Sequence, residues 1–220
     1  MERSIDLVID DLKKLILSMG GYVEKALSQA TLALIHRQVD LFKEVHEIEK
    51  KINEAHIQVD NACVNILAKQ GPVAKDLRLI LSIIKINTDL ERMGDQSVNI
   101  AFTGKDYLER SSSTSLNEIA RMTDIVKTMV RESLDSFVKG DVEQARRILA
   151  MDDEVDLLKN RVFDTLKEHM KTAPQDVEAS LDLILVARNL ERLGDHATNI
   201  AEDVIYAFTG KDIRHGGNFG

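Results

Sequence analysis

The chain has 220 residues, a formal net charge of −8 and a hydrophobic fraction of 44%, so it is long enough to bury a sizeable core. The acidic balance argues against a nucleic-acid partner, because backbone phosphates require clustered lysines and arginines. Only two prolines and no tryptophan, with many Leu, Ile, Ala, Glu and Lys residues, favour long helices, and we expect an all-α fold.

The beginning of the chain and its most apolar stretch indicate neither export nor membrane insertion. Residues 1–14 lack the basic start and apolar core of a signal peptide, so we expect a cytoplasmic protein. The stretch 77–86 is interrupted by Arg78 and Lys85 and is shorter than the roughly 20 apolar residues that cross a bilayer. The single cysteine, Cys63, excludes a disulfide framework and is expected to be an inert buried thiol.

Helical periodicity extends along the chain and is interrupted at five places. The predicted breaks lie at 37–40, 70–72, 111–114, 140–141 and 173–174. Six helices are therefore predicted, at 4–36, 40–69, 72–108, 115–139, 141–171 and 174–208. The serine-rich segment 111–114 is expected to link the two halves of the chain.

Residues at the predicted helix ends give these boundaries a physical basis. Pro72 and Pro174 suit a first helical turn, where no amide donor is needed. Capping boxes and C-terminal glycine stops are also predicted. The capping boxes are Ser115 with Glu118 and Asp141 with Gln144, and the stops are Gly104 before Lys105 and Gly210 before Lys211.

The chain contains an internal repeat. A shift of 100 residues places 90–95, Leu-Glu-Arg-Met-Gly-Asp, on 190–195, Leu-Glu-Arg-Leu-Gly-Asp, and a shift of 103 aligns the earlier helices of the two halves. Short connections make consecutive helices antiparallel neighbours. We therefore predict two tandem antiparallel three-helix bundles related by pseudo-two-fold symmetry, at 1–110 and 115–210, followed by a tail at 211–220.

Carboxylate and amide side chains recur every four residues along four of the predicted helices, a spacing that places them on one helix face. In each half, two such stripes lie at similar distances from the turn between their helices, so antiparallel packing puts them at nearly one height. The predicted stripes are Glu49 and Asn53, then Glu91, Asp95 and Asn99, in the first half, and Asp152 and Asp156, then Glu191, Asp195, Asn199 and Asp203, in the second.

Carboxylates that converge in this way repel one another unless a cation offsets their charge. Oxygen ligands favour Mg²⁺, Mn²⁺ or iron, and zinc also accepts carboxylates. The alternative for a single stripe is a solvated acidic face whose acids pair with Arg92 or Arg192, but repetition in two halves favours metal binding. The mid-helix glycines Gly94 and Gly194 suggest a close approach of another group, or simple packing.

The motif Leu-Glu-Arg-x-Gly-Asp in both halves, together with Met19-Gly20-Gly21, Ala62-Cys63-Val64, Asp76-Leu77-Arg78 and Arg214-His215, resembles the PhoU family of phosphate-transport regulators over nearly the whole chain. The resemblance implies two three-helix bundles whose acid-x-x-x-Asp motifs hold multinuclear iron or zinc clusters, or magnesium and manganese. These motifs fall on Glu49–Asn53, Glu91–Asp95, Asp152–Asp156 and Glu191–Asp195. Asn53 departs from the pattern, so the first site is expected to bind metal more weakly.

The resemblance also implies a role. Family members act at the cytoplasmic face, between the ATP-driven phosphate transporter and a sensor histidine kinase, and repress the phosphate-starvation response when phosphate is plentiful. We therefore expect a non-enzymatic regulator that contacts the transporter's ATPase subunit and the kinase, reaches the membrane only through them, forms a homodimer and binds no nucleic acid.

Two other functions were weighed. A di-iron carboxylate oxidase builds a similar site from Glu and Glu-x-x-His motifs, but the chain has no Glu-x-x-His, and His196 points about 100° away from the stripe of Asp195. A plain helical adaptor would dock basic partners on its acidic faces and bind metal incidentally. Metal content and the effect of ligand variants distinguish these readings.

Overall fold

A computed structural model describes residues 4–110 and 115–214. In these residues the chain forms six α-helices and one 3₁₀ turn, with no strand, which confirms the all-α prediction. The predicted ends agree to within about three residues, and the linker 111–114 and residues 215–220 of the tail lie outside the described residues. The elements are α1 Ser4–Ile35, α2 Asp40–Gln70, α3 Ala74–Glu109, α4 Asn117–Lys139, α5 Val142–Thr172, η1 Pro174–Asp176 and α6 Val177–Thr209.

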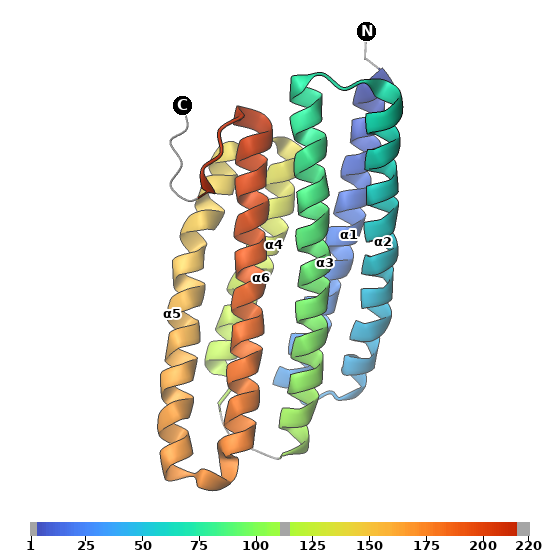
Figure 1. Cartoon of the computed structure of the whole chain (residues 1–220). Coiled ribbons are helices and arrows are strands. Elements are labelled where there is room, and N and C mark those ends of the chain that lie inside the picture. Colours follow the sequence, from blue (N-terminus) through green and yellow to red (C-terminus); the bar gives the residue numbers. More distant parts are fainter. Residues whose placement is uncertain (1–3, 111–114, 215–220) are drawn as a thin grey trace.

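The helices lie side by side with nearly parallel axes as two antiparallel three-helix bundles, α1 to α3 and α4 to α6 (Figure 1). Helices α3 and α6 form the most extensive helix–helix contact of the described chain, and α1 also packs on α4. Helix α2 packs on α1 and α3, and α5 packs on α4 and α6, so these two flank the molecule. The buried apolar residues of both bundles form one continuous core.

Glycines in the left-handed conformation end three helices, because this conformation turns the chain and disfavours other residues. Gly71, Gly140 and Gly210 follow α2, α4 and α6 with φ angles of +52°, +67° and +74°. Asp141 begins α5 as predicted: its Oδ1 accepts a hydrogen bond from the backbone N–H of Gln144 at 2.9 Å. No helix in 4–110 or 115–214 has the length and hydropathy to span a membrane.

Other predicted helix ends are wrong in detail. Helix α4 begins at Asn117 with no side-chain cap, and Ser115 Oγ instead accepts a hydrogen bond from the N–H of Asn117 at 3.4 Å. The capping box with Glu118 therefore does not form. Pro72 precedes the first turn of α3, and Pro174 opens the 3₁₀ turn rather than α6 itself.

Gly104 does not end α3, contrary to the prediction, because the helix continues to Glu109. A Cβ atom at Gly104 would lie 3.2 Å from Cζ of Phe42, so the missing side chain makes room for this ring from α2. The glycine serves the packing of α2 on α3, a role that local sequence does not distinguish from a helix stop.

Candidate metal centres

In the second half, α5 and α6 bring four carboxylates together. Asp152 and Asp156 lie one turn apart on α5, and Glu191 and Asp195 lie one turn apart on α6. Lys159 joins the two helices: its Nζ lies 2.7 Å from Asp156 Oδ1 and 2.8 Å from Glu191 Oε1. The ammonium group therefore offsets part of the negative charge of the cluster.

Neighbouring carboxylates change the pKa values of Asp152 and Asp195. Burial raises the pKa of Asp152 to about 6, and the negative charges of Asp195, Asp156 and Glu191 add to the shift. Burial also raises the pKa of Asp195, again with help from Glu191 and Asp156. Each group costs free energy when ionised in this place. Excess negative charge is thus built into the interface between α5 and α6.

Gly194 lies directly beside Asp152 of α5. A Cβ atom at Gly194 would lie 3.4 Å from Asp152 Oδ1, a distance at the limit of ordinary van der Waals contact. In the first half, a Cβ at Gly94 would lie 3.0 Å from Cδ1 of Ile52. Both glycines allow the close approach that the sequence suggested, but the approaching group is a carboxylate only in the second half.

The first half arranges its stripe residues differently. On α2, Asn53 Nδ2 donates a hydrogen bond to Glu49 Oε1. On α3, Arg92 pairs with both neighbouring acids, with Nε 3.5 Å from Glu91 and Nη1 3.7 Å from Asp95. These interactions stay within their own helices. The pairing of Arg92 is the one that the solvated-face alternative predicted.

The donor set can be tested against the metal that the resemblance implies. Four carboxylates, of which burial and nearby negative charge make Asp152 and Asp195 costly to ionise, suit a hard cation. The side chains are not yet oriented around one, because no group of three or more His, Cys, Asp or Glu residues in 4–110 and 115–214 is arranged to hold a metal ion. Asp156 and Glu191 instead form ion pairs with Lys159. The residues of the second half fit a metal in chemistry, and metal binding stays a prediction.

The outer residues of the predicted stripes lie elsewhere. Asn199 Nδ2 donates to Asp89 Oδ1 on α3 at 3.2 Å, and Asp203 is buried between Lys85 Nζ at 3.3 Å and Arg214 Nη1 at 3.5 Å. Burial raises the pKa of Asp203 although both cations oppose the shift. The assignment of Asp203 to the face of Glu191 was therefore wrong.

The cause is the pitch of the helix. Four residues turn an α-helix by about 40° more than one full turn, so three such steps rotate the side chain by about 120°. Glu191 consequently faces α5, whereas Asp203 reaches the seam with α3. On α3 itself, Asn99 is exposed one turn beyond Asp95.

Sequence reasoning missed two residues that organise these regions. Lys159 bridges the acids of the second half, and its spacing of three residues from Asp156 was a signal that could have identified it. Asp89 Oδ1 lies 2.8 Å from His196 Nδ1 and so joins α3 to α6. The repeat gave no indication of Asp89, because the equivalent position holds Asn189.

Matches to known proteins cover both halves of the chain. The PhoU domain family model matches residues 16–103 and 119–204. The chain is 38% identical over 218 residues to the "Phosphate-specific transport system accessory protein PhoU homolog" of Pseudomonas putida, covering 99% of this chain and 85% of that protein. The Pseudomonas aeruginosa protein of the same name is 39% identical over 216 residues, covering 98% and 89%. The "Phosphate-specific transport system accessory protein PhoU" of Escherichia coli is 32% identical over 209 residues, covering 95% and 87%.

Solved structures share the architecture. The crystal structure of PhoU from Pseudomonas aeruginosa superposes with a TM-score of 0.91 at 37% identity, over 94% of this chain and all 100% of that one. The phosphate transport system regulatory protein PhoU from Streptococcus pneumoniae has the same fold, with a TM-score of 0.87 at 24% identity over 96% and 99% of the two chains. On its sequence and its structure, the chain belongs to the PhoU family.

Proposed function

We propose that this protein is a cytoplasmic, metal-binding regulator of phosphate uptake, which represses the phosphate-starvation response when phosphate is plentiful. The observation that carries the proposal is similarity along nearly the whole chain, at 38% and 39% identity, to relatives named as accessory proteins of a phosphate-specific transport system. The word "accessory" in those names supports action through contact with other proteins rather than through catalysis.

The proposed partners are the ATPase subunit of the phosphate transporter and a sensor histidine kinase, with the protein acting as a homodimer. A bundle of long helices suits this role, because it presents extended rigid faces. The name of the relatives supports the transporter as a partner. The kinase is proposed from the resemblance stated for the sequence motifs.

The metal would be held chiefly by Asp152, Asp156, Glu191 and Asp195, and more weakly by the first-half residues Glu49, Asn53, Glu91 and Asp95. A bound divalent or iron-type cation supplies positive charge that offsets the repulsion between these carboxylates. Lys159 pairs with one oxygen of Asp156 and one of Glu191, so the other oxygen of each carboxylate would be the ligand. The chain's own contribution is to hold acids of α5 and α6 at one height and to exclude part of the solvent from Asp152.

The regulatory role is tested in cells that lack the gene and carry a reporter of phosphate starvation. The wild-type protein is expected to restore repression in phosphate-rich medium, and to co-purify with the transporter ATPase more strongly from phosphate-rich than from starved cells. A reporter that stays repressed without the gene contradicts the regulatory role.

The metal assignment has a separate test. Protein purified without a nickel column is analysed for bound metal by mass spectrometry, beside Glu191→Ala/Asp195→Ala and the matched first-half variant Glu91→Ala/Asp95→Ala. The second-half variant is expected to lose most of the metal and the first-half variant less. Unchanged metal content in the second-half variant would exclude these residues as ligands, whatever the reporter shows.

A further inference from the structure

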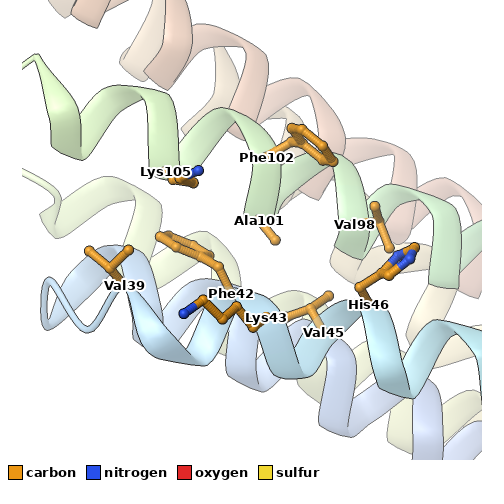
Figure 2. Close-up of a pocket in the computed structure, with 9 residues that line it drawn as sticks. All are labelled: Val39, Phe42, Lys43, Val45, His46, Val98, Ala101, Phe102 and Lys105. Atoms are coloured by element: carbon orange, nitrogen blue, oxygen red, sulfur yellow. The ribbon is translucent and has the colours of Figure 1, made fainter.

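An apolar groove lies between the beginning of α2 and the last third of α3 (Figure 2). Val39, just before α2, and Phe42 and Val45 of α2 face Val98 and Ala101 of α3, with a volume of about 190 Å³ between them. This volume is below the roughly 300 Å³ at which sites for small molecules begin. The groove therefore suits one or two anchoring side chains of another protein rather than a free ligand.

Phe102 stands on the rim of this groove and is 70% exposed, the largest exposed fraction among the large hydrophobic residues of the described chain. Val39 at the other rim is 46% exposed. Aromatic side chains beside a concave apolar surface are typical of protein interfaces. The groove and Phe102 thus form one contiguous surface, which we name the α2/α3 groove.

The repeat indicates that helix packing does not require Phe102. The position of the second half that corresponds to Phe102 holds Glu202, whereas Phe42, which Ala145 replaces, is buried and packs against Gly104. Each bundle has three helices, and the Phe102 side chain, 70% exposed, buries little of its surface in the first of them, so it adds little to helix packing. The presence of Phe102 in the first half alone therefore indicates that this face has a function other than helix packing.

The charges around the groove define its partner. The titratable side chains that line it are Lys43, His46 and Lys105, and none of the lining residues is acidic. Their acidic neighbours lie outside the groove: Lys43 is 3.5 Å from Asp40 and Lys105 is 3.8 Å from Glu109, in exposed pairs, and His46 Nδ1 is 3.8 Å from the partly buried Glu49. Exposed pairs of this kind are weak, so acids of a partner replace them readily. A basic rim is distinctive on a chain whose net charge is −8.

We infer that the α2/α3 groove binds an acidic amphipathic helix of another protein, with one or two large apolar side chains inserted between α2 and α3 and glutamate or aspartate residues beside Lys43 and Lys105. Helix-in-groove recognition places anchors at positions i, i+3 or i+4, and i+7 of the bound helix. The charges set its orientation. The inference goes beyond the proposed function, because it assumes neither phosphate nor a transport partner.

Two other occupants fit less well. A second copy of this chain, docked through the same face, would bring Lys43 and Lys105 of both copies together. An anionic membrane would attract the lysines, but the net charge of −8 opposes that approach and a concave surface offers little to a bilayer.

The test uses a synthetic helical peptide of about 16 residues, with a tryptophan and two leucines on one face and glutamates on both flanks. The chain has no tryptophan, so the peptide's emission reports its environment alone. Binding is expected to shift that emission to shorter wavelength. Lys43→Glu/Lys105→Glu should weaken binding at least tenfold, and Phe102→Ser several-fold.

The matched control is Lys50→Glu/Lys171→Glu, which makes the same change of charge at exposed lysines outside the groove. It is expected to bind within about twofold of the wild type at equal ionic strength. Absence of peptide binding, equal binding of a lysine-flanked peptide, or equal loss in both double variants overturns the inference. It also fails if Phe102→Ser dissociates a dimer or abolishes binding to phosphatidylglycerol vesicles while peptide affinity is unchanged.

Discussion

The two halves of the molecule present the same acidic motif in two electrostatic states. In the second half, four carboxylates face one another across α5 and α6, and Lys159 bridges two of them. In the first half, Asn53 binds Glu49 along α2, and Arg92 pairs with both acids of α3. Of the side chains named here, four carboxylates and Lys159 leave a formal charge of −3 in the second half, and three carboxylates and Arg92 leave −2 in the first, where Asn53 adds a hydrogen bond but no charge.

The comparison shows how a duplicated unit can diverge without a change of fold. An amide in place of a carboxylate removes one charge and adds a donor, which lets Asn53 satisfy Glu49 locally. Asp156 has no such donor and depends on Lys159. The exchange of Asn53 for Asp156 therefore changes both the charge of the stripe and the source of its hydrogen-bond donor.

The exchange of these two residues gives the largest expected effect. Asp156→Asn should weaken Mn²⁺ binding to the second half at least tenfold, because a neutral oxygen replaces a charged ligand, and Asn53→Asp should strengthen binding to the first half by a similar factor. Titration calorimetry with MnCl₂ measures both. Asp164→Asn, at an exposed acid further along α5, is the matched control and should leave the isotherm unchanged. Equal affinities of wild type and Asp156→Asn would remove Asp156 from the ligand set.

The raised pKa of Asp152 gives the next effect, in metal-free protein. The unfolded chain releases this proton near 3.8 and the folded chain near 6, so the folded state binds more protons between these values and loses stability as pH rises through them. Asp152→Asn avoids this cost. In EDTA it should raise the free energy of unfolding by about 1 to 2 kcal/mol at pH 7.5, a figure reduced from the full shift because Asp152 is partly exposed.

Urea unfolding at several pH values measures this difference between Asp152→Asn and wild type. The difference should shrink steadily below pH 6 and vanish only below about pH 3, where both states of the wild type hold the proton. Saturating Mn²⁺ should reverse its sign, because the variant lacks a ligand. A difference that stays constant from pH 4 to pH 7.5 contradicts the charge argument.

Much of the fold followed from local chemistry. Gly71, Gly140, Gly210 and Asp141 end or begin helices through their own conformational preferences or hydrogen bonds, so the sequence alone located them. Gly104 failed as a predicted stop because its role depends on the ring of Phe42, which lies far away in the sequence. The sequence therefore predicts a helix end correctly when nearby residues determine it. It fails when the role of a residue depends on contact with another helix.

The candidate site shows the same limit. Counting residues from the turn between α5 and α6 correctly predicted that their acids lie at the same height along the bundle, because the rise per helical residue is fixed. It did not show that Lys159 would bridge them, nor that Asp203 would turn toward Lys85, because both outcomes depend on rotation about the helix axis and on neighbouring helices. The α2/α3 groove was also missed, since its walls come from two helices and its basic rim spans both.

The paired glycines give the smallest effect. An alanine in mid-helix is favoured over glycine by about 1 kcal/mol. At Gly94 the new Cβ would lie 3.0 Å and 3.2 Å from two carbons of the fully buried Ile52, so overpacking should outweigh that gain. At Gly194 the nearest atom is Asp152 Oδ1 at 3.4 Å, at the end of a side chain that can move. Gly94→Ala is expected to destabilise the protein by about 1 kcal/mol, and Gly194→Ala to stabilise it by up to about 1 kcal/mol.

Ile52→Val separates packing from backbone effects in this comparison. It removes Cδ1, the atom nearest to the new Cβ, so it should cost less stability in the Gly94→Ala background than in the wild type. Purely additive unfolding free energies would mean that Ile52 is not the obstacle. Gly194→Ala should be indifferent to the same substitution, because Ile52 packs in the other bundle and the neighbours of Gly194 are Asp152, Val155 and Met129. The sign of the change in unfolding free energy then depends on the residue that contacts each glycine. This residue is the buried Ile52 at Gly94 and the movable carboxylate of Asp152 at Gly194.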